Sequence, residues 1–141
     1  LKVVATMINQ VGFDSVRIFD PHSEVSSALI ERSKPVTNHR FVKDALQKVV
    51  QGSDFYLVSP DAGALKKIHG VAKFLDHHQV LECMKTRDVK TGQLSGFKVF
   101  ELDLEGKPCV IVDDICDGGG TFAGIGKALK ERNAGKIILI V

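Results

Sequence analysis

Two spacings of apolar residues alternate along this chain, one typical of amphipathic helices and the other of short buried strands. Apolar side chains recur every three or four positions in segments that predict helices at residues 1–11, 24–32, 41–50, 64–75 and 122–132. Short apolar runs predict strands at residues 16–19, 55–58, 79–84, 97–102, 110–112 and 136–141, with an extended edge at 35–37. Because helices and strands alternate with short connections, we expect an α/β fold whose mostly parallel sheet is flanked by helices.

The size and composition of the chain are those of one soluble globular unit. Its 141 residues can bury a sizeable core, and 44% of them are hydrophobic while 26% are charged. The first residue is Leu1 rather than methionine, and Val141 ends a buried-strand pattern. We therefore expect the chain to be part of a longer protein.

Charge and cysteine content argue against several classes of partner. The net charge is +2, the basic residues are scattered, and the chain has one tyrosine and no tryptophan, so we expect no nucleic-acid partner. No segment approaches the roughly 20 apolar residues of a membrane span, so we expect no membrane partner. Three cysteines without a paired metal motif favour reduced thiols and a cytoplasmic location.

The run from residue 110 to residue 121 is the most specific chemical pattern in the sequence. An apolar strand ends at two carboxylates, and a glycine-rich loop then leads into a predicted helix. Backbone N–H groups of such a loop, together with the positive end of a helix, form a phosphate site. The paired acids cannot hold the phosphate, because like charges repel, but they suit sugar hydroxyls or a divalent cation. We therefore predict a ribose 5-phosphate site made by Asp113, Asp114, Asp117, Gly118, Gly119, Gly120 and Thr121.

Three further polar loops follow predicted strands. Each of them, considered by itself, is a common turn or a solvated loop and does not indicate a functional site. Residues 20–23 read Asp-Pro-His-Ser, in which the Asp and the His together can hold a divalent metal or a polyphosphate. Residues 59–63 read Ser-Pro-Asp-Ala-Gly, and residues 85–92 form a charged loop that begins Lys-Thr-Arg. Ligands of open α/β sheets bind beyond the carboxyl ends of the strands, so we expect these loops to converge with the glycine-rich loop. Lys66 and Lys67 could attract phosphate, although a solvated helix face is the simpler interpretation.

The content and order of these motifs resemble a known family. Residues 110–121 resemble the phosphoribosyl-pyrophosphate (PRPP) motif that type I phosphoribosyltransferases share with ribose-phosphate diphosphokinases. The elements at 20–23 and 59–63, followed by the Lys-x-Arg at 85–87, resemble the diphosphokinases in particular. Phosphoribosyltransferases normally lack the first two of these elements, so the resemblance is more specific than the glycine-rich motif by itself.

This resemblance implies a fold, a division of the chain and an activity. The fold would be type I phosphoribosyltransferase-like over residues 1–141, with 1–34 resembling the end of the family's N-terminal domain and 35–141 most of its C-terminal domain. The implied reaction transfers diphosphate from ATP to the 1-hydroxyl of ribose 5-phosphate, giving PRPP and AMP, with Mg²⁺ as the cofactor. The family usually forms homo-oligomers, and its members are longer than this chain, so we expect an oligomer and expect the chain alone to be inactive.

The resemblance also implies roles for individual residues. His22 and Asp61 correspond to residues that hold Mg²⁺ and the phosphates of ATP, and Asp20, beside His22, is the third candidate for the metal. Lys85 and Arg87 correspond to the catalytic residues, whose positive charges would stabilise the transition state as AMP leaves.

Two other functions fit the same sequence. One is a phosphoribosyltransferase, which consumes PRPP rather than making it and does not form AMP from ATP. The other is a non-catalytic subunit, regulatory or scaffolding, that resembles PRPP synthetases. The presence of Lys85, Arg87 and the motif acids counts against this second alternative.

Overall fold

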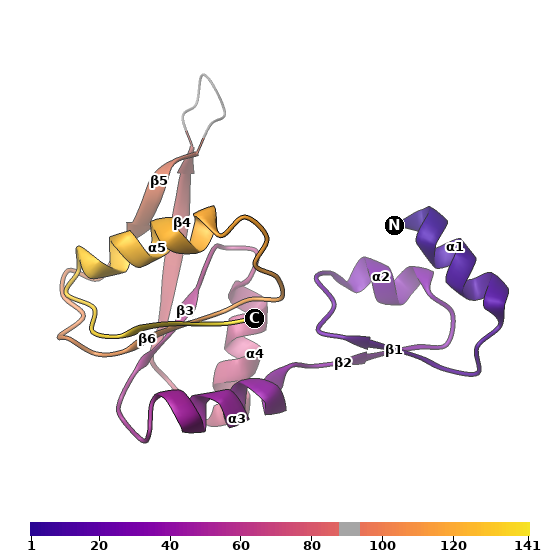
Figure 1. The fold of residues 1–141 in the computed structure, drawn as a ribbon, viewed down its shortest axis with the longest axis horizontal. Coiled ribbons are helices and arrows are strands. Elements are labelled where there is room, and N and C mark those ends of the chain that lie inside the picture. Colours follow the sequence, from indigo (N-terminus) through magenta and orange to yellow (C-terminus); the bar gives the residue numbers. More distant parts are fainter. Residues whose placement is uncertain (88–93) are drawn as a thin grey trace. The chain divides into compact units, whose positions relative to one another are not determined.

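Two separate sheets organise the chain, which divides into the units Leu1–Arg40 and Phe41–Val141 (Figure 1). The computed structural model describes residues 1–87 and 94–141, and for Arg87, Leu94 and Ser95 it describes the backbone only. We call the two units the N-terminal unit and the C-terminal unit. No helix in the described ranges is both long and apolar enough to cross a membrane.

In the N-terminal unit, two helices alternate with the two strands of a short parallel sheet. The elements are α1 (Lys2–Val11), β1 (Val16–Phe19), α2 (Glu24–Leu29) and β2 (Ser33–Val36). Val16 lies opposite Ser33, and Phe19 lies opposite Val36. The first helix ends because Gly12 adopts a left-handed conformation, with φ 74°.

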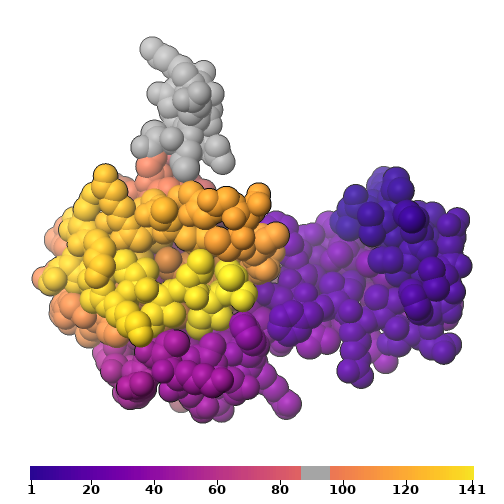
Figure 2. All heavy atoms as spheres, in the orientation of Figure 1, coloured from indigo at the N-terminus to yellow at the C-terminus, as the bar shows by residue number. Residues whose placement is uncertain are grey.

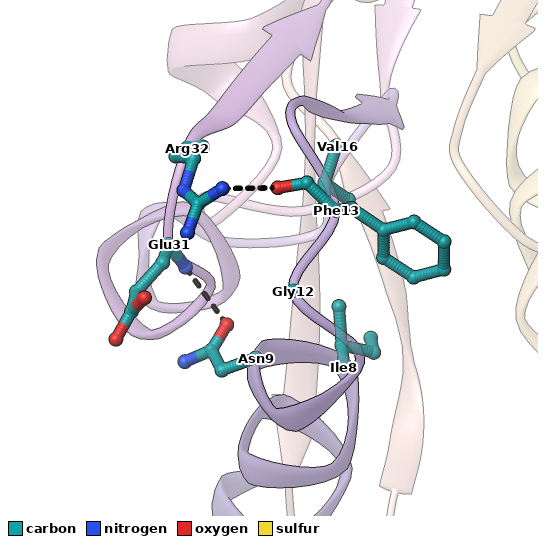
Figure 3. Close-up of a pocket in the computed structure, with 7 residues that line it drawn as sticks. All are labelled: Ile8, Asn9, Gly12, Phe13, Val16, Glu31 and Arg32. Carbon is teal, nitrogen blue, oxygen red and sulfur yellow. Dashed lines mark hydrogen bonds between the residues drawn. The ribbon is translucent and has the colours of Figure 1, made fainter.

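Asn9 fastens the end of α1 to the end of α2. Its Nδ2 donates a hydrogen bond to the carbonyl of Leu29 (3.0 Å), and its Oδ1 accepts one from the N–H of Glu31 (2.9 Å). Arg32 Nη1 donates to the carbonyl of Phe13 at 2.8 Å (Figure 3). These contacts border a small pocket that contains none of the predicted site residues. It is lined by Ile8, Asn9, Gly12, Phe13, Val16, Glu31 and Arg32.

The C-terminal unit is a five-stranded sheet in the order β5-β4-β3-β6-β7. The strands are β3 (Tyr56–Ser59), β4 (Val80–Arg87), β5 (Leu94–Val99), β6 (Cys109–Val112) and β7 (Ile137–Ile140). Neighbouring strands are parallel, except that β5 is antiparallel to β4 at one edge. The α/β fold with a mostly parallel sheet, predicted from the sequence, is confirmed.

Helices cover both faces of this sheet (Figure 1). Val58 and Ile111 pack with α5 (Gly120–Lys130), whereas Leu57 and Val110 pack with α3 (His39–Val49) and α4 (Leu65–Leu75). The division follows from the pleat of a strand, which points successive side chains to opposite faces. In Figure 2 the orange and yellow atoms of α5 and β7 make up much of the visible surface of this unit. The central strands are therefore buried on both sides, and their ends are held in place.

The hairpin of β4 and β5 differs from the sequence prediction. The strand predicted at 79–84 continues to Arg87, so the first residues of the predicted charged loop belong to a strand. Antiparallel pairing with β5 explains the extension, since Lys85 lies opposite Phe97 in the ladder. The remainder of the predicted loop, residues 88–92, lies outside the described residues.

Other predicted boundaries also move: the helix predicted at 41–50 is α3, which begins two residues earlier, and the edge predicted at 35–37 is β2. The strand predicted at 97–102 is β5, which starts and ends earlier because it pairs with the extended β4. The helix predicted at 24–32 ends at Leu29, because Ile30 takes an extended conformation (φ −95°, ψ 116°). The helix predicted at 122–132 is α5, which begins within the glycines and ends two residues early.

Three of the four predicted loops leave the same sheet. Residues 60–63 follow β3, Lys85 lies near the end of β4, and residues 113–119 follow β6. These strands are parallel neighbours, so their carboxyl ends share one edge of the sheet. Residues 20–23 follow β1, which belongs to the other sheet, so this topological argument does not extend to them.

Gly124 sets how closely α5 packs on the hairpin. A Cβ at Gly124 would meet the ring of Phe97 in β5, whereas a Cβ at Gly126 would meet no atom within 4 Å. We predict that Gly124→Ala lowers the free energy of unfolding by about 1–3 kcal/mol, because the site would be overpacked. Gly126→Ala should raise it by up to about 1 kcal/mol, because alanine favours the helix. Denaturant unfolding measures both variants, and equal effects would contradict this account of the packing.

Candidate functional site

The turn from β6 into α5 presents backbone amides at the shared edge of the sheet. Every residue of β6 is buried, and α5 begins at Gly120. Gly119 caps the helix with φ 72°, a conformation that glycine adopts without steric cost. The N–H of Ala123 bonds to the carbonyl of Gly119, so the amides of Gly120 and Thr121 precede the first intrahelical bond and have no acceptor within the helix.

The glycines leave room beside this backbone. An added Cβ at Gly118, Gly119 or Gly120 would meet no protein atom within 4 Å, so packing does not require glycine at these positions. Asp117 is exposed in the loop, and Thr121 lies half-buried in the first turn of α5. That first turn contains no acidic residue. Open space, unpaired amides and the positive end of a helix together suit a phosphate group.

Asp113 and Asp114, directly after β6, form a half-buried carboxylate pair. The N–H of Asp114 donates to Asp113 Oδ1 at 2.9 Å. Burial is the largest effect on Asp113 and raises its pKa, and the neighbouring Asp114 carboxyl raises the pKa further. The N–H of Asp114 and the charge of Lys67 act in the opposite direction but do not outweigh these effects. Oxygens arranged as a pair can accept hydrogen bonds from the adjacent hydroxyls of a sugar.

Lys67 supplies a cation to this pair. It lies in α4, and its Nζ is 3.4 Å from Asp114 Oδ1. The two side chains are only 21% and 16% exposed, so the contact is partly shielded from water. The sequence alone predicts a solvated helix face for Lys67, whereas its side chain is mostly shielded from water. The contact of Lys67 with Asp114 depends on the strand order, which places α4 beside the end of β6. The spacing of residues in the sequence does not contain that order.

Asp61 and Lys85, predicted from separate motifs, are in direct contact. Lys85 Nζ donates to Asp61 Oδ2 at 2.7 Å. Asp61 Oδ1 accepts from the N–H of Ala64 (3.1 Å), and the Asp61 carbonyl accepts from the buried hydroxyl of Ser59 (2.8 Å). Burial alone would raise the pKa of Asp61, but the hydrogen bonds from Lys85 and Ala64 outweigh it and lower the pKa. Asp61 is therefore held as a carboxylate beside a cation.

Three predicted residues remain, of which two belong to the N-terminal unit and one has a side chain outside the described residues. His22 and Asp20 belong to the N-terminal unit. Asp20 adopts φ 46°, and its Oδ2 accepts from Nδ2 of the buried Asn38 at 2.9 Å. Arg87 ends β4, and its side chain lies outside the described residues.

The described residues offer single carboxylates to a metal ion rather than a complete set of protein ligands. Within residues 1–87 and 94–141, no group of three or more His, Cys, Asp or Glu side chains could by itself hold a metal ion. Mg²⁺ commonly binds through one or two carboxylates together with substrate phosphates. Asp61 offers one such carboxylate at the edge where the loops meet.

Known proteins resemble this chain in both sequence and fold. The sequence pattern of the phosphoribosyl transferase domain family matches residues 38–141. A ribose-phosphate pyrophosphokinase of Marinomonas sp. (strain MWYL1) is 36% identical to this chain over 97% of its length. The ribose-phosphate pyrophosphokinase of Shewanella oneidensis is 33% identical to it over 96% of its length. The chain spans 43% and 42% of the length of those two relatives.

The fold is similar to that of phosphoribosylpyrophosphate synthetase from Mycobacterium smegmatis in its crystal structure. The TM-score is 0.81 at 24% identity, over 98% of this chain and 44% of that one. The type I phosphoribosyltransferase-like fold expected from the sequence is confirmed. The chain therefore belongs to the phosphoribosyl transferase domain family, and over nearly its whole length it is similar to ribose-phosphate pyrophosphokinases.

Proposed function

We propose that the protein transfers diphosphate from ATP to the 1-hydroxyl of ribose 5-phosphate, giving PRPP and AMP. The observation that carries this proposal is the 2.7 Å contact between Lys85 Nζ and Asp61 Oδ2, at the sheet edge where the β6–α5 turn lies. The cation of Lys85 and the carboxylate of Asp61 thus lie at the same sheet edge as a turn suited to a sugar phosphate, and that carboxylate suits Mg²⁺. The names of the similar proteins, ribose-phosphate pyrophosphokinases, support the same reaction.

In this proposal the β6–α5 turn binds the sugar phosphate. The backbone amides of residues 117–121 hold the 5-phosphate, which also lies at the positive end of α5. Asp113 and Asp114 accept hydrogen bonds from the ribose hydroxyls and so orient the ring. The sugar is thereby held at both ends, which fixes the position of its 1-hydroxyl.

The transfer step itself needs positioning and neutralisation more than covalent chemistry. The oxygen of the 1-hydroxyl attacks the β-phosphorus of ATP, and the bond from that phosphorus to the oxygen bridging the α-phosphate breaks. AMP leaves with the bonding electrons, and the hydroxyl proton passes to solvent. Lys85, with Arg87 as the second proposed catalytic residue, neutralises the charge that develops on the transferring group.

The cofactor and partners of the proposed enzyme follow from the same residues. Asp61 would offer a carboxylate to Mg²⁺, which when bound would neutralise the phosphates of ATP. His22 and Asp20 of the N-terminal unit stay candidates for the metal on the sequence resemblance alone. ATP and ribose 5-phosphate are the proposed substrates. We further propose a homo-oligomer in the cytoplasm, a location that suits the three free thiols Cys83, Cys109 and Cys116.

Loss of the Lys85 ammonium should affect turnover rather than sugar binding. We predict that Lys85→Ala in the full-length protein lowers the rate of AMP formation by about 100-fold or more. Affinity for ribose 5-phosphate, measured by calorimetry, should hardly change. Lys98→Ala is the matched control, because Lys98 lies on the paired strand β5 and is directed at the ring of Phe100. Equal turnover of Lys85→Ala and Lys98→Ala would contradict the catalytic role.

The same assay separates the proposal from its alternatives. A phosphoribosyltransferase would release diphosphate from PRPP and would form no AMP from ATP. A non-catalytic subunit would show no turnover, even where it binds ribose 5-phosphate. Magnesium-dependent AMP formation that requires ribose 5-phosphate is the result that the proposal predicts.

The backbone conformation of Gly119 should be required for sugar-phosphate binding. We predict that Gly119→Ala weakens binding of ribose 5-phosphate by about tenfold or more, because a side chain disfavours φ 72° by about 1–2 kcal/mol and relief of that strain turns the amides away. Gly106→Ala is the control, since Gly106 also has a left-handed conformation (φ 69°) and an added Cβ there meets nothing within 4 Å. Calorimetry should show normal binding for Gly106→Ala despite a similar loss of stability. If both variants bind normally, the turn does not hold the phosphate.

A further inference from the structure

The contact between Lys67 and Asp114 joins two elements that are distant in the sequence. Lys67 lies in α4, which follows β3, and Asp114 lies in the loop after β6, 47 residues later. The two strands are neighbours in the sheet, so the lysine is brought to the motif acids by the fold alone. The Nζ–Oδ1 distance is 3.4 Å, and the side chains are mostly shielded from water.

We propose that Lys67 is a positioning residue of the ribose site, which holds the Asp114 carboxylate and offsets its repulsion with Asp113. The inference rests on the proposed sugar-phosphate function of the β6–α5 turn. Lys67 would act through Asp114 and needs no contact of its own with the sugar phosphate. Its role therefore differs from that of Lys85, which faces Asp61 and the proposed ATP phosphates.

A chain of two contacts gives Lys67 influence over both acids. Its ammonium contacts Asp114 Oδ1, and the N–H of Asp114 in turn donates to Asp113 Oδ1. By restraining Asp114, Lys67 also restrains the backbone N–H of Asp114, which donates to Asp113 and orients it. Restricting the rotamers of the two carboxylates before the sugar binds lowers the entropy cost of accepting hydrogen bonds from adjacent hydroxyls, so this restraint preorganises the pair.

The charge of Lys67 also matters, because two acids side by side resist being ionised together. Burial and the neighbouring Asp114 raise the pKa of Asp113, and Lys67 opposes that rise. Removal of the ammonium should therefore raise the pKa of Asp113 further. A protonated Asp113 offers fewer acceptor sites to ribose hydroxyls, so binding of ribose 5-phosphate should then fail at a higher pH than in the unaltered chain.

Lys67→Met, Lys67→Arg and Lys73→Met form a matched set of variants of the 141-residue chain. Lys73 lies on the same helix as Lys67 and is exposed, so Lys73→Met controls for the loss of a positive charge in α4. Calorimetric titration with ribose 5-phosphate, repeated at several pH values from mildly acidic to neutral, measures affinity and its pH dependence. The carboxyl ¹³C resonance of Asp113 gives its pKa in the absence of ligand.

We expect Lys67→Met to weaken binding of ribose 5-phosphate about tenfold at neutral pH, because Asp114 loses the charged hydrogen bond that orients the pair of acids before the sugar binds. The acidic limb of its binding profile and the pKa of Asp113 should both move upward. Lys67→Arg should restore both, and Lys73→Met should match the unaltered chain. Should Lys67→Met fail to fold, Lys67→Gln serves the same comparison.

The possible outcomes separate this inference from the proposed function. Normal affinity and an unmoved pH profile in Lys67→Met, while the unaltered chain binds ribose 5-phosphate, would overturn the role of Lys67 alone. Weakened binding without any change in the pH profile or in the pKa of Asp113 would also overturn it, because that pattern marks a merely structural effect. A folded, unaltered chain that does not bind ribose 5-phosphate at any pH would overturn the sugar-phosphate site itself.

Discussion

The parallel pairing of β6 with β3 is the constraint on which the rest of the site depends. Leu57 lies opposite Val110 and Val58 opposite Ile111, and helices bury these residues on both faces of the sheet. Because the strands end level with one another, the acids that follow them leave the sheet at one edge. The same register brings α4 beside the end of β6 and β4 beside the end of β3. The contacts of Lys67 with Asp114 and of Lys85 with Asp61 follow from that arrangement.

Asp61 and Asp113 lie at this edge of the sheet, and their pKa values shift in opposite directions. Hydrogen bonds from Lys85 and Ala64 lower the pKa of Asp61 against the effect of burial, which favours the charged form that a cation needs. Burial and a neighbouring acid raise the pKa of Asp113, and the charge of Lys67 opposes that rise. In its ionised form Asp113 can accept hydrogen bonds from neutral hydroxyls. In the proposed site, backbone amides would hold the phosphate, the paired acids would accept hydrogen bonds from the hydroxyls, and lysines would balance the charge of the acids.

The sequence predicts an element well when the residues of that element set its boundaries. The prediction fails where contact with a segment distant in the sequence sets the boundary or the partner. The end of β6 and the loop after it are predicted well, because an apolar run followed by two acids and three glycines defines its own boundary. The predicted strand is shorter than β4, because the charged residues Lys85 and Arg87 are typical of a loop. Their pairing with β5, which the local pattern does not reveal, makes them part of the strand. The pairing of Lys67 with Asp114 is missed, because it depends on the order of the strands rather than on spacing. The role of His22 stays a prediction, since it belongs to the other unit.

The central claim is that the β6–α5 turn holds a sugar phosphate between its amides and its paired acids. A crystal structure of the chain with ribose 5-phosphate tests this most directly. The account predicts phosphate oxygens about 3 Å from the backbone amides of residues 118–121, with ribose hydroxyls on Asp113 and Asp114. Phosphate bound elsewhere, or a turn left empty in crystals grown at saturating ligand, would contradict it.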